Sequence, residues 1–311
     1  MSSLREIKGK IRGVAKTRQV TRAMEAVSAS KMRKSQEKAI AGRPYAISAF
    51  RILRGLSKNF NTKESFFVKE REMKKVLVIL ITSDRGFAGG LNSSVIKKTL
   101  AFMSDKKLGK DEVSFVCVGK KGNDFFSKRG YSISQNFEKF EDALPIAEVE
   151  EISALGVNLY KEGSFDHVFV AYSNFISTFA QEPLFHQALP LREVEISQII
   201  KTIAPTRGKY SEIFKNDDIE NEKVFSDYLF EPSAESVFEQ LVFDLIKVLV
   251  FQSFMEGKAS EFSARMVAMR SASDKALEMG NALTLSYNKA RQSVITREVS
   301  EIVGGVEALA S

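Results

Sequence analysis

The most regular pattern of apolar and small residues in the chain lies in its last fifty residues, 262–311. These residues are separated by alternating intervals of four and three, and no proline interrupts them. They are Phe262, Met266, Met269, Ser273, Ala276, Gly280, Leu283, Tyr287, Ala290 and Val294. This spacing is typical of the seam of a coiled coil, so it predicts a long helix that packs against a second one. Gly280 costs a helix about 1 kcal/mol relative to alanine, which indicates that close approach of the partner matters at this position.

The N-terminal stretch predicts the partner helix, because apolar side chains recur there at helical spacing. They are Leu4, Ile7, Ile11, Val14, Met24, Val27 and Met32. Pro44 removes a backbone donor, so we expect a kink or a short break at residues 42–44. We assign residues 1–58 to this helix and residues 232–311 to the C-terminal one. A globular middle that reverses the chain would make the two helices pair antiparallel.

Residues 74–203 predict a Rossmann-like domain. The segments 76–82 and 113–119 are continuously apolar, which is typical of strands that are covered on both faces. Helical patterns follow at about 92–103, with Asn92 or Ser93 as the expected cap, at 120–129 and at 146–162. A third strand is expected at 166–175. This alternation indicates three layers around a mostly parallel sheet, so the predicted fold class is α/β with an antiparallel coiled coil.

The end of the middle region has a different character. We expect a hairpin-like extension over residues 176–203, with Pro183 and Pro190 marking its turns. Residues 204–226 are polar and charged, so we assign residues 204–231 to an exposed loop and connection.

The segment 232–255 is the most apolar helical pattern in the chain, and a membrane span is one interpretation. However, Glu239, Asp244 and Lys247 fall inside a run that is barely long enough to cross a bilayer. We therefore predict a helix that is buried between the α/β domain and the N-terminal helix, with no direct membrane span.

The charge of the chain is unevenly distributed. Residues 1–58 contain fifteen Lys and Arg and three acids, a local net charge of +12, so the rest of the chain sums to −5 of the total +7. A helix face of this kind is usually only solvated. The asymmetry nevertheless favours an acidic partner, which could be a nucleic acid, an anionic membrane or an acidic protein surface.

Few residues suited to catalysis or metal binding are present. The chain has one cysteine, Cys117, inside an apolar run, and two histidines, His167 and His186, without paired spacing. This composition argues against a disulfide framework, a metal centre and nucleophilic catalysis, so we expect no cofactor. The glycine-rich segment 83–90 (SDRGFAGG) resembles a phosphate loop but matches neither the dinucleotide fingerprint nor the P-loop. A tight strand-to-helix turn is the simpler interpretation.

Three stretches resemble the gamma subunit of F-type ATP synthases. They are Thr21–Gln36 (TRAMEAVSASKMRKSQ), Thr82–Asn92 (TSDRGFAGGLN) and Tyr287–Gly305 (YNKARQSVITREVSEIVGG). They lie at both ends and in the middle, so the resemblance covers nearly the whole chain.

The resemblance implies a central rotor shaft that couples ion flow to ATP synthesis or hydrolysis and is not itself catalytic. Its implied partners are three alpha and three beta subunits, an epsilon subunit and the membrane rotor ring of c subunits. Because the N-terminus has neither a signal core nor a transit-peptide composition, we expect a bacterial protein. It would be peripheral on the cytoplasmic face of the inner (plasma) membrane.

The resemblance also implies partner-contact residues. Arg291, Gln292 and Thr296 match positions that bond a loop of a catalytic subunit, and Met24 and Arg265 match positions near the acidic lever of the beta subunit. In the segment Asp227–Pro232, Tyr228 and Glu231 match positions that touch the rotor ring.

Two alternatives remain open from the residues alone. One is a nucleic-acid-binding α/β protein with a basic coiled-coil arm, although base-reading residues on that arm are sparse. The other is a nucleotide-dependent enzyme that uses segment 83–90.

Overall fold

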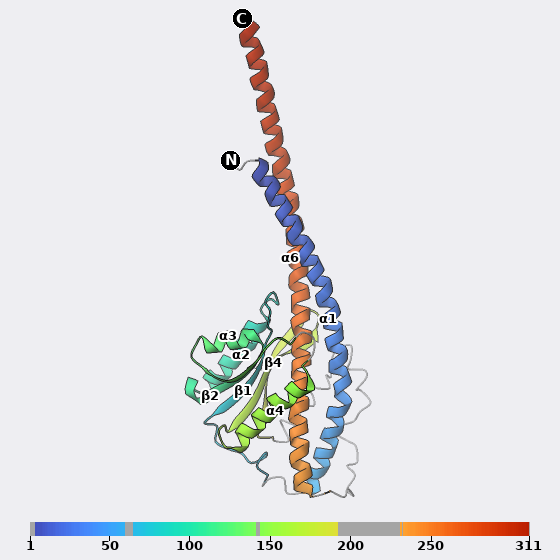
Figure 1. The fold of residues 1–311 in the computed structure, drawn as a ribbon, viewed down its shortest axis with the longest axis vertical. Coiled ribbons are helices and arrows are strands. Elements are labelled where there is room, and N and C mark those ends of the chain that lie inside the picture. The colour runs from blue at the N-terminus through green and yellow to red at the C-terminus, as the bar shows by residue number, and fades with distance from the viewer. Residues whose placement is uncertain (1–3, 60–64, 141–143, 192–230, 232, 311) are drawn as a thin grey trace. The chain divides into compact units, whose positions relative to one another are not determined.

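The computed structural model describes residues 4–59, 65–140, 144–191, 231 and 233–310 (Figure 1). The chain divides into two compact units. We call Met1–Ser28 with Met266–Ser311 the helical unit, and Ala29–Arg265 the sheet unit. Helices α1 (Leu4–Asn59) and α6 (Ala234–Ala310) contribute residues to both.

The seam predicted on α6 is confirmed. From Ser273 to Val294, each predicted seam position is buried or half-buried, and every residue between these positions is exposed. A Cβ atom placed on Gly280 would lie 3.8 Å from Val14 Cγ1, which is ordinary van der Waals contact. A larger side chain would therefore push α1 away at this point.

The helices pair antiparallel, as predicted. In the helical unit Val14 faces Gly280, and in the sheet unit the Lys31 ammonium lies 5.6 Å from the ring centroid of Phe262. The helices therefore run in opposite directions, because a higher residue number on α1 faces a lower one on α6. In both pairs the two residue numbers add up to about 294.

The prediction for Val27 is wrong, because its side chain is 54% exposed. The buried stripe of α1 instead continues through Thr21 and Ser28, which are 9% and 3% exposed. These positions keep the 3–4 spacing that begins at Leu4 and Ile7, but they carry small polar side chains. A search for apolar residues alone therefore selects the wrong face.

Of the kink or short break expected at residues 42–44, the break is absent, since α1 is one helix from Leu4 to Asn59, and the kink stays a prediction. Pro44 removes a single backbone donor, and the turns on either side continue the helix.

The sheet has five strands in the order β3-β2-β1-β4-β5. They are β1 (Val76–Ile81), β2 (Val113–Val118), β3 (Ser132–Phe137), β4 (His167–Ser177) and β5 (Ala180–Leu189). β1 pairs in parallel with β2 and β4, β2 pairs in parallel with β3, and β5 runs antiparallel to β4. Every residue of β1 and β2 is buried, as their continuous apolar runs predict.

Two features of the sheet edges differ from the sequence-based expectation. β3 was not predicted, because it is an edge strand with mostly polar residues. Pro183 does not mark a turn but lies inside β5, paired with Ser173 of β4. A proline is tolerated there because an edge strand has one side without ladder bonds. The turn of the hairpin lies between Ser177 and Ala180, and Pro190 follows the last residue of β5.

The three-layer arrangement is confirmed. Helices α2 (Leu91–Asp105) and α3 (Lys120–Ser127) share one apolar core with alternate strand residues such as Val78 and Phe115. α4 (Ile146–Lys161) and α6 share the other core with Ile79 and Val116. A short 3-10 helix, η2 (Lys110–Glu112), precedes β2.

Within α6, the apolar stretch after residue 234 is packed into the second core, as predicted. Phe238, Val242, Leu249 and Phe254 are each at most 2% exposed, and burial of each such side chain contributes about 1.5–3 kcal/mol. Among the described residues, no helix is long and apolar enough to cross a membrane.

The expected cap of α2 is wrong. The helix begins at Leu91 after Gly90, which makes no side-chain cap, and Asn92 lies inside the first turn. The side-chain amide of Asn92 instead forms two hydrogen bonds with Ser83. Cys117 is buried, as predicted for a strand residue, and desolvation raises the pKa of its thiol to about 12.

Position 119 requires glycine for two reasons, a backbone φ of +108° and the close approach of neighbouring atoms. A Cβ atom there would lie 2.1 Å from the carbonyl oxygen of Thr82, whereas one on Gly130, with φ +77°, would meet nothing within 4 Å. Gly130→Ala should cost about 1–2 kcal/mol for the left-handed backbone alone, and Gly119→Ala should cost more because the backbone must also shift. Urea unfolding of both variants measures the difference, and equal losses would contradict the prediction.

Candidate functional site

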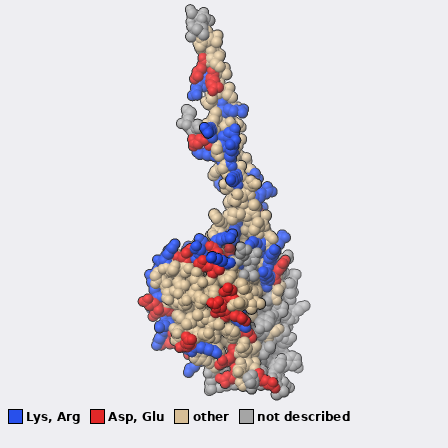
Figure 2. All heavy atoms as spheres, in the orientation of Figure 1, with Lys and Arg blue, Asp and Glu red and all other residues tan. Residues whose placement is uncertain are grey.

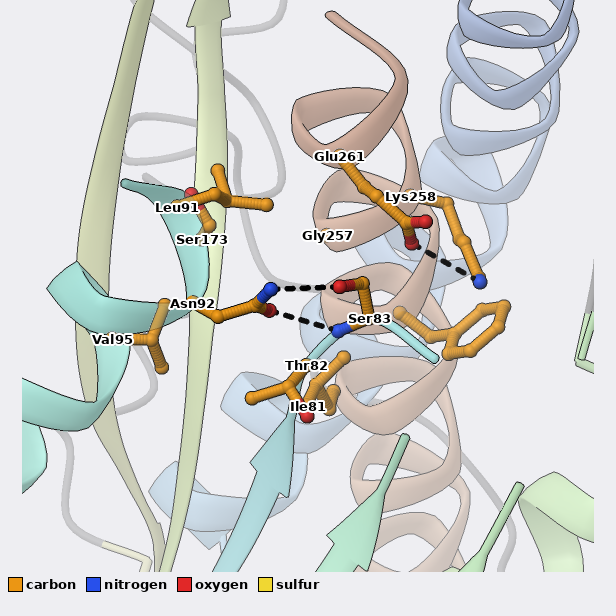
Figure 3. Close-up of a pocket in the computed structure, with 11 residues that line it drawn as sticks. Ile81, Thr82, Ser83, Leu91, Asn92, Val95, Ser173, Gly257, Lys258 and Glu261 are labelled. Atoms are coloured by element: carbon orange, nitrogen blue, oxygen red, sulfur yellow. Dashed lines mark hydrogen bonds and ion pairs between the residues drawn. The ribbon is translucent and has the colours of Figure 1, made fainter. Parts of the chain in front are cut away.

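The loop after β1, residues 83–90, is fixed by its own side chains. The Ser83 N–H donates to Asn92 Oδ1 at 3.0 Å, and Asn92 Nδ2 donates to Ser83 Oγ at 2.7 Å (Figure 3). Ser83 Oγ in turn donates to the carbonyl oxygen of Arg85 at 2.7 Å. Ser83 thus bonds both the start of α2 and the backbone of its own loop.

Asp84 connects the ends of three neighbouring strands. It follows β1, and its carboxylate accepts bonds from the Lys120 N–H after β2 at 3.0 Å and from the Lys139 N–H after β3 at 3.1 Å. Thr82 Oγ1 accepts from the Gly122 N–H at 2.9 Å. These bonds satisfy backbone donors at the start of α3, so the segment has a structural task that the sequence did not reveal.

The strand order reverses between β1 and β4, and this is where open α/β sheets usually bind ligands. Here α6 occupies that crevice. Gly257, Lys258 and Glu261 line it, and a Cβ atom on Gly257 would lie 3.3 Å from Ile81 Cγ2. The remaining cavity of about 10 Å³ holds no more than one water molecule. It has no room for a nucleotide.

Three charged side chains of α6 are buried beside this crevice. Lys258, Glu261 and Arg265 are 5–7% exposed, and Glu261 accepts from Lys258 at 3.2 Å and from Arg265 at 2.7 Å. Arg265 also donates to the carbonyl oxygen of Gly86 at 3.1 Å. Buried charges persist only when they are paired and hydrogen-bonded, and this group meets that condition.

The predicted partner-contact residues lie in different environments. Arg265 is buried in the sheet unit and bonded by its own chain, whereas Met24 is half-buried in the helical unit. The contact of either residue with a partner stays a prediction. Glu231 is exposed, and Tyr228 lies outside the described residues.

Arg291, Gln292 and Thr296 are all exposed near the end of α6. Thr296 Oγ1 donates to the Gln292 carbonyl oxygen at 3.0 Å. The three residues thus lie on neighbouring turns of α6 with exposed side chains, and their contact with a partner stays a prediction.

The last described turns of α6 carry apolar side chains without cover from α1. In the register that pairs Val14 with Gly280, Leu4 would face about residue 290. Beyond it, five apolar residues are 48–66% exposed: Ile295, Val299, Ile302, Val303 and Val306. At 3.6 residues per turn their directions fall within an arc of about 100°, so they form one apolar stripe along the helix. Such uncovered apolar surface marks a region of partner contact.

The basic residues of α1 in the helical unit are exposed except for Arg18, which is half-buried, and Lys and Arg side chains can be followed along the paired helices (Figure 2). Six of them are exposed: Arg5, Lys8, Lys10, Arg12, Lys16 and Arg22.

Sequence reasoning missed Glu261 and the serines Ser260 and Ser263, all of which are buried on α6. They follow the apolar segment 232–255 in a stretch of polar and small residues, EGKASEFSAR at 256–265, so no local pattern marked them as buried.

Comparison with known proteins gives a consistent result. The family model described as ATP synthase matches residues 3–309. A protein of Heliobacterium modesticaldum named ATP synthase gamma chain is 37% identical over 99% of this chain and 100% of its own length. A protein of Nitrosomonas europaea with the same name is 36% identical over the same shares.

Solved structures share the fold. A chain of the mitochondrial ATP synthase of Euglena gracilis, from an assembly of OSCP, F1 and c-ring, gives a TM-score of 0.63 at 17% identity, over 98% of this chain and 94% of that one. A chain of the central stalk and c-ring of the Tetrahymena thermophila mitochondrial enzyme gives 0.57 at 20% identity, over 82% and 99%.

Proposed function

This chain belongs to the family of ATP synthase gamma chains, and we propose that it is the central rotor shaft of a bacterial ATP synthase. The observation that carries the proposal is the uncovered end of α6, residues 291–306, where exposed apolar residues stand beside Arg291 and Gln292. An uncovered apolar stripe of this kind is typical of a surface that a partner covers. In the proposal that partner is a ring of three alpha and three beta subunits.

The shaft would act through differences in contact energy. A single asymmetric helix end makes different contacts with each of three catalytic subunits, so each rotational position favours different nucleotide affinities. By linkage, nucleotide turnover then drives rotation of the shaft, and rotation drives synthesis.

The chain itself is proposed to be non-catalytic. The crevice at the strand-order reversal is filled by α6, and the side chains of Ser83 and Asp84 are bonded to Asn92, to the Arg85 carbonyl group and to the backbone at Lys120. Nucleotide chemistry would therefore take place in partner subunits.

The remaining partners follow from family membership. An epsilon subunit and a membrane ring of c subunits would bind the sheet unit and the segment around Tyr228 and Glu231. The protein would then be peripheral on the cytoplasmic face of the inner membrane, coupling ion flow through the ring to ATP turnover. The basic side of α1 and Met24 would serve the acidic lever of the beta subunit, and no observation favours nucleic acid as the partner instead. Arg265 matches a position near the same lever, but its guanidinium is bonded to Glu261 and Gly86 of its own chain, so a contact with the lever would need a change in these bonds.

Reconstitution tests the proposal directly. The isolated chain should show no ATP hydrolysis, and mixing it with alpha and beta subunits of a bacterial relative should give a complex that hydrolyses ATP. A bead attached to the sheet unit should rotate in that complex. If the chain neither joins the complex nor raises its hydrolysis above that of alpha and beta alone, the proposal is wrong.

The end of α6 gives a further prediction. The double change Arg291→Leu and Gln292→Leu should leave assembly intact but lower hydrolysis about tenfold or more, because each charge-assisted bond to a catalytic subunit is worth about 1.5–3 kcal/mol. Lys275→Leu is the control, since Lys275 is exposed and pairs only with Glu278 at the surface. Wild-type hydrolysis in the double variant would show that both side chains are only solvated.

Glu231 gives the prediction for the membrane side. Glu231→Gln should reduce ion pumping per ATP in membrane-reconstituted enzyme while hydrolysis by the soluble sector stays unchanged, because a contact with the ring would lose its charge. Glu235→Gln is the matched control, in the exposed first turn of α6. Equal pumping by the two variants would count against a role for Glu231.

A further inference from the structure

One segment of α6 is enclosed on every side within the sheet unit. From Gln252 to Arg265, only Gly257 and Ala264 are not buried, and even these are half-buried. A helix normally keeps an exposed face, so burial around the full circumference requires neighbours in all directions.

The β4–β5 hairpin binds one side of this segment. Ser260 Oγ donates to the Ser173 carbonyl oxygen at 2.9 Å, and Ser263 Oγ donates to the Thr178 carbonyl oxygen at 2.6 Å. Gln181 Nε2 lies 3.5 Å from Ser263 Oγ and donates to the same Thr178 carbonyl at 3.2 Å. Ser260 and Ser263 are each 0% exposed, so solvent cannot replace these bonds.

The loop 83–90 binds another side. Arg265 reaches the carbonyl oxygens of Gly86 and Arg85, at 3.1 Å and 3.4 Å, and Glu261 holds its guanidinium. The loop cannot simply follow the helix, because Asp84 and the Ser83–Asn92 pair tie it to the sheet. We call this loop and residues 173–181 of the β4–β5 hairpin the collar.

The two sets of bonds lie on opposite sides of the helix. At 3.6 residues per turn, the direction of Ser260 and Ser263 differs from that of Lys258, Glu261 and Arg265 by about 160°. Rotation of α6 about its own axis would therefore shear both sets at once. Apolar packing is non-directional, whereas hydrogen bonds weaken steeply when their geometry is disturbed.

We propose that the collar and residues 258–265 of α6 form the joint that transmits torque between the sheet unit and the shaft helix. This inference rests on the proposed rotor function and assigns positioning roles to Ser260 and Ser263. Without these bonds, the helix and the sheet unit would twist against each other under load, and part of the rotation would be lost.

The test uses Ser263→Ala and the double variant Ser260→Ala/Ser263→Ala in the complete, membrane-reconstituted enzyme. A fluorescent rod is attached through Lys97→Cys, which is exposed on α2. Cys117 does not compete because it is buried and the pKa of its thiol is about 12. The angular fluctuation of the rod is recorded in complexes stalled by withholding nucleotide, with ion pumping per ATP measured in parallel.

We expect a wider angular distribution and a loss of pumping per ATP of about twofold or more in the double variant, with a smaller effect in Ser263→Ala, because each lost bond weakens the joint. Soluble-sector hydrolysis should remain near wild type. Ser271→Ala, at an exposed serine of the same helix, should change nothing. Gly130→Ala is expected to lower the stability of the sheet unit without changing a contact of α6. If its angular distribution is that of the wild type, the wider distribution in the serine variants is due to the joint and not to general destabilisation.

If both serine variants show the angular distribution and the ion pumping per ATP of the wild type, the proposed joint is wrong. The single variant removes one hydroxyl, so it answers the question even if the double variant does not assemble. If the unmodified chain fails to support hydrolysis or rotation, the rotor function itself fails, and the two outcomes are distinguishable.

Discussion

Burial of α6 is the constraint on which the rest of the structure depends. Its first turns carry large apolar side chains that must be covered, and the sheet, α4 and α1 together supply that cover in the sheet unit. Further along, the exposed positions outnumber the seam positions, and only a stripe is covered by α1. After Val294 every described side chain of α6 is exposed, up to Val306. The surroundings of the helix thus change along its length, while its backbone conformation does not.

Small and polar seam residues make this arrangement slender. Thr21 and Ser28 on α1, and Ser273, Ala276 and Gly280 on α6, take the places that larger apolar residues occupy in most coiled coils. Each of these residues buries less apolar surface than a leucine would. The packing of α1 on α6 is therefore less stable, by about 25 cal/mol for each Å² of apolar area that a leucine would have buried in addition. The gain is close approach of the backbones, which suits a shaft that turns inside a ring.

The sheet unit shows how a fold that often binds ligands can hold a helix instead. Its crevice at the strand-order reversal receives Gly257, Lys258 and Glu261, and its glycine-rich loop presents carbonyl groups to Arg265. A charge buried without a partner would cost several kcal/mol, so Lys258, Glu261 and Arg265 depend on one another and on the position of that loop. The motif that resembles a phosphate site is therefore better understood as part of the support for α6.

The sequence by itself determined the two long helices, their antiparallel pairing, the α6 seam, the buried strands β1, β2 and β4 and the three-layer order. These features follow from periodic burial, which repeats every 3.5 residues in a coiled coil and leaves continuous apolar runs in covered strands. The family resemblance, and not the periodic pattern, singled out Arg291, Gln292 and Thr296, and their contact with a partner stays a prediction. Only the tertiary structure decided the polar part of the α1 seam through Thr21 and Ser28, the edge strand β3, and the place of Pro183 inside β5. The same holds for Arg265 and Ser263, whose partners Gly86 and Thr178 lie far away in the sequence. A small polar side chain can bond equally well to water or to a distant carbonyl group. The local sequence pattern therefore does not indicate whether such a side chain is exposed or buried.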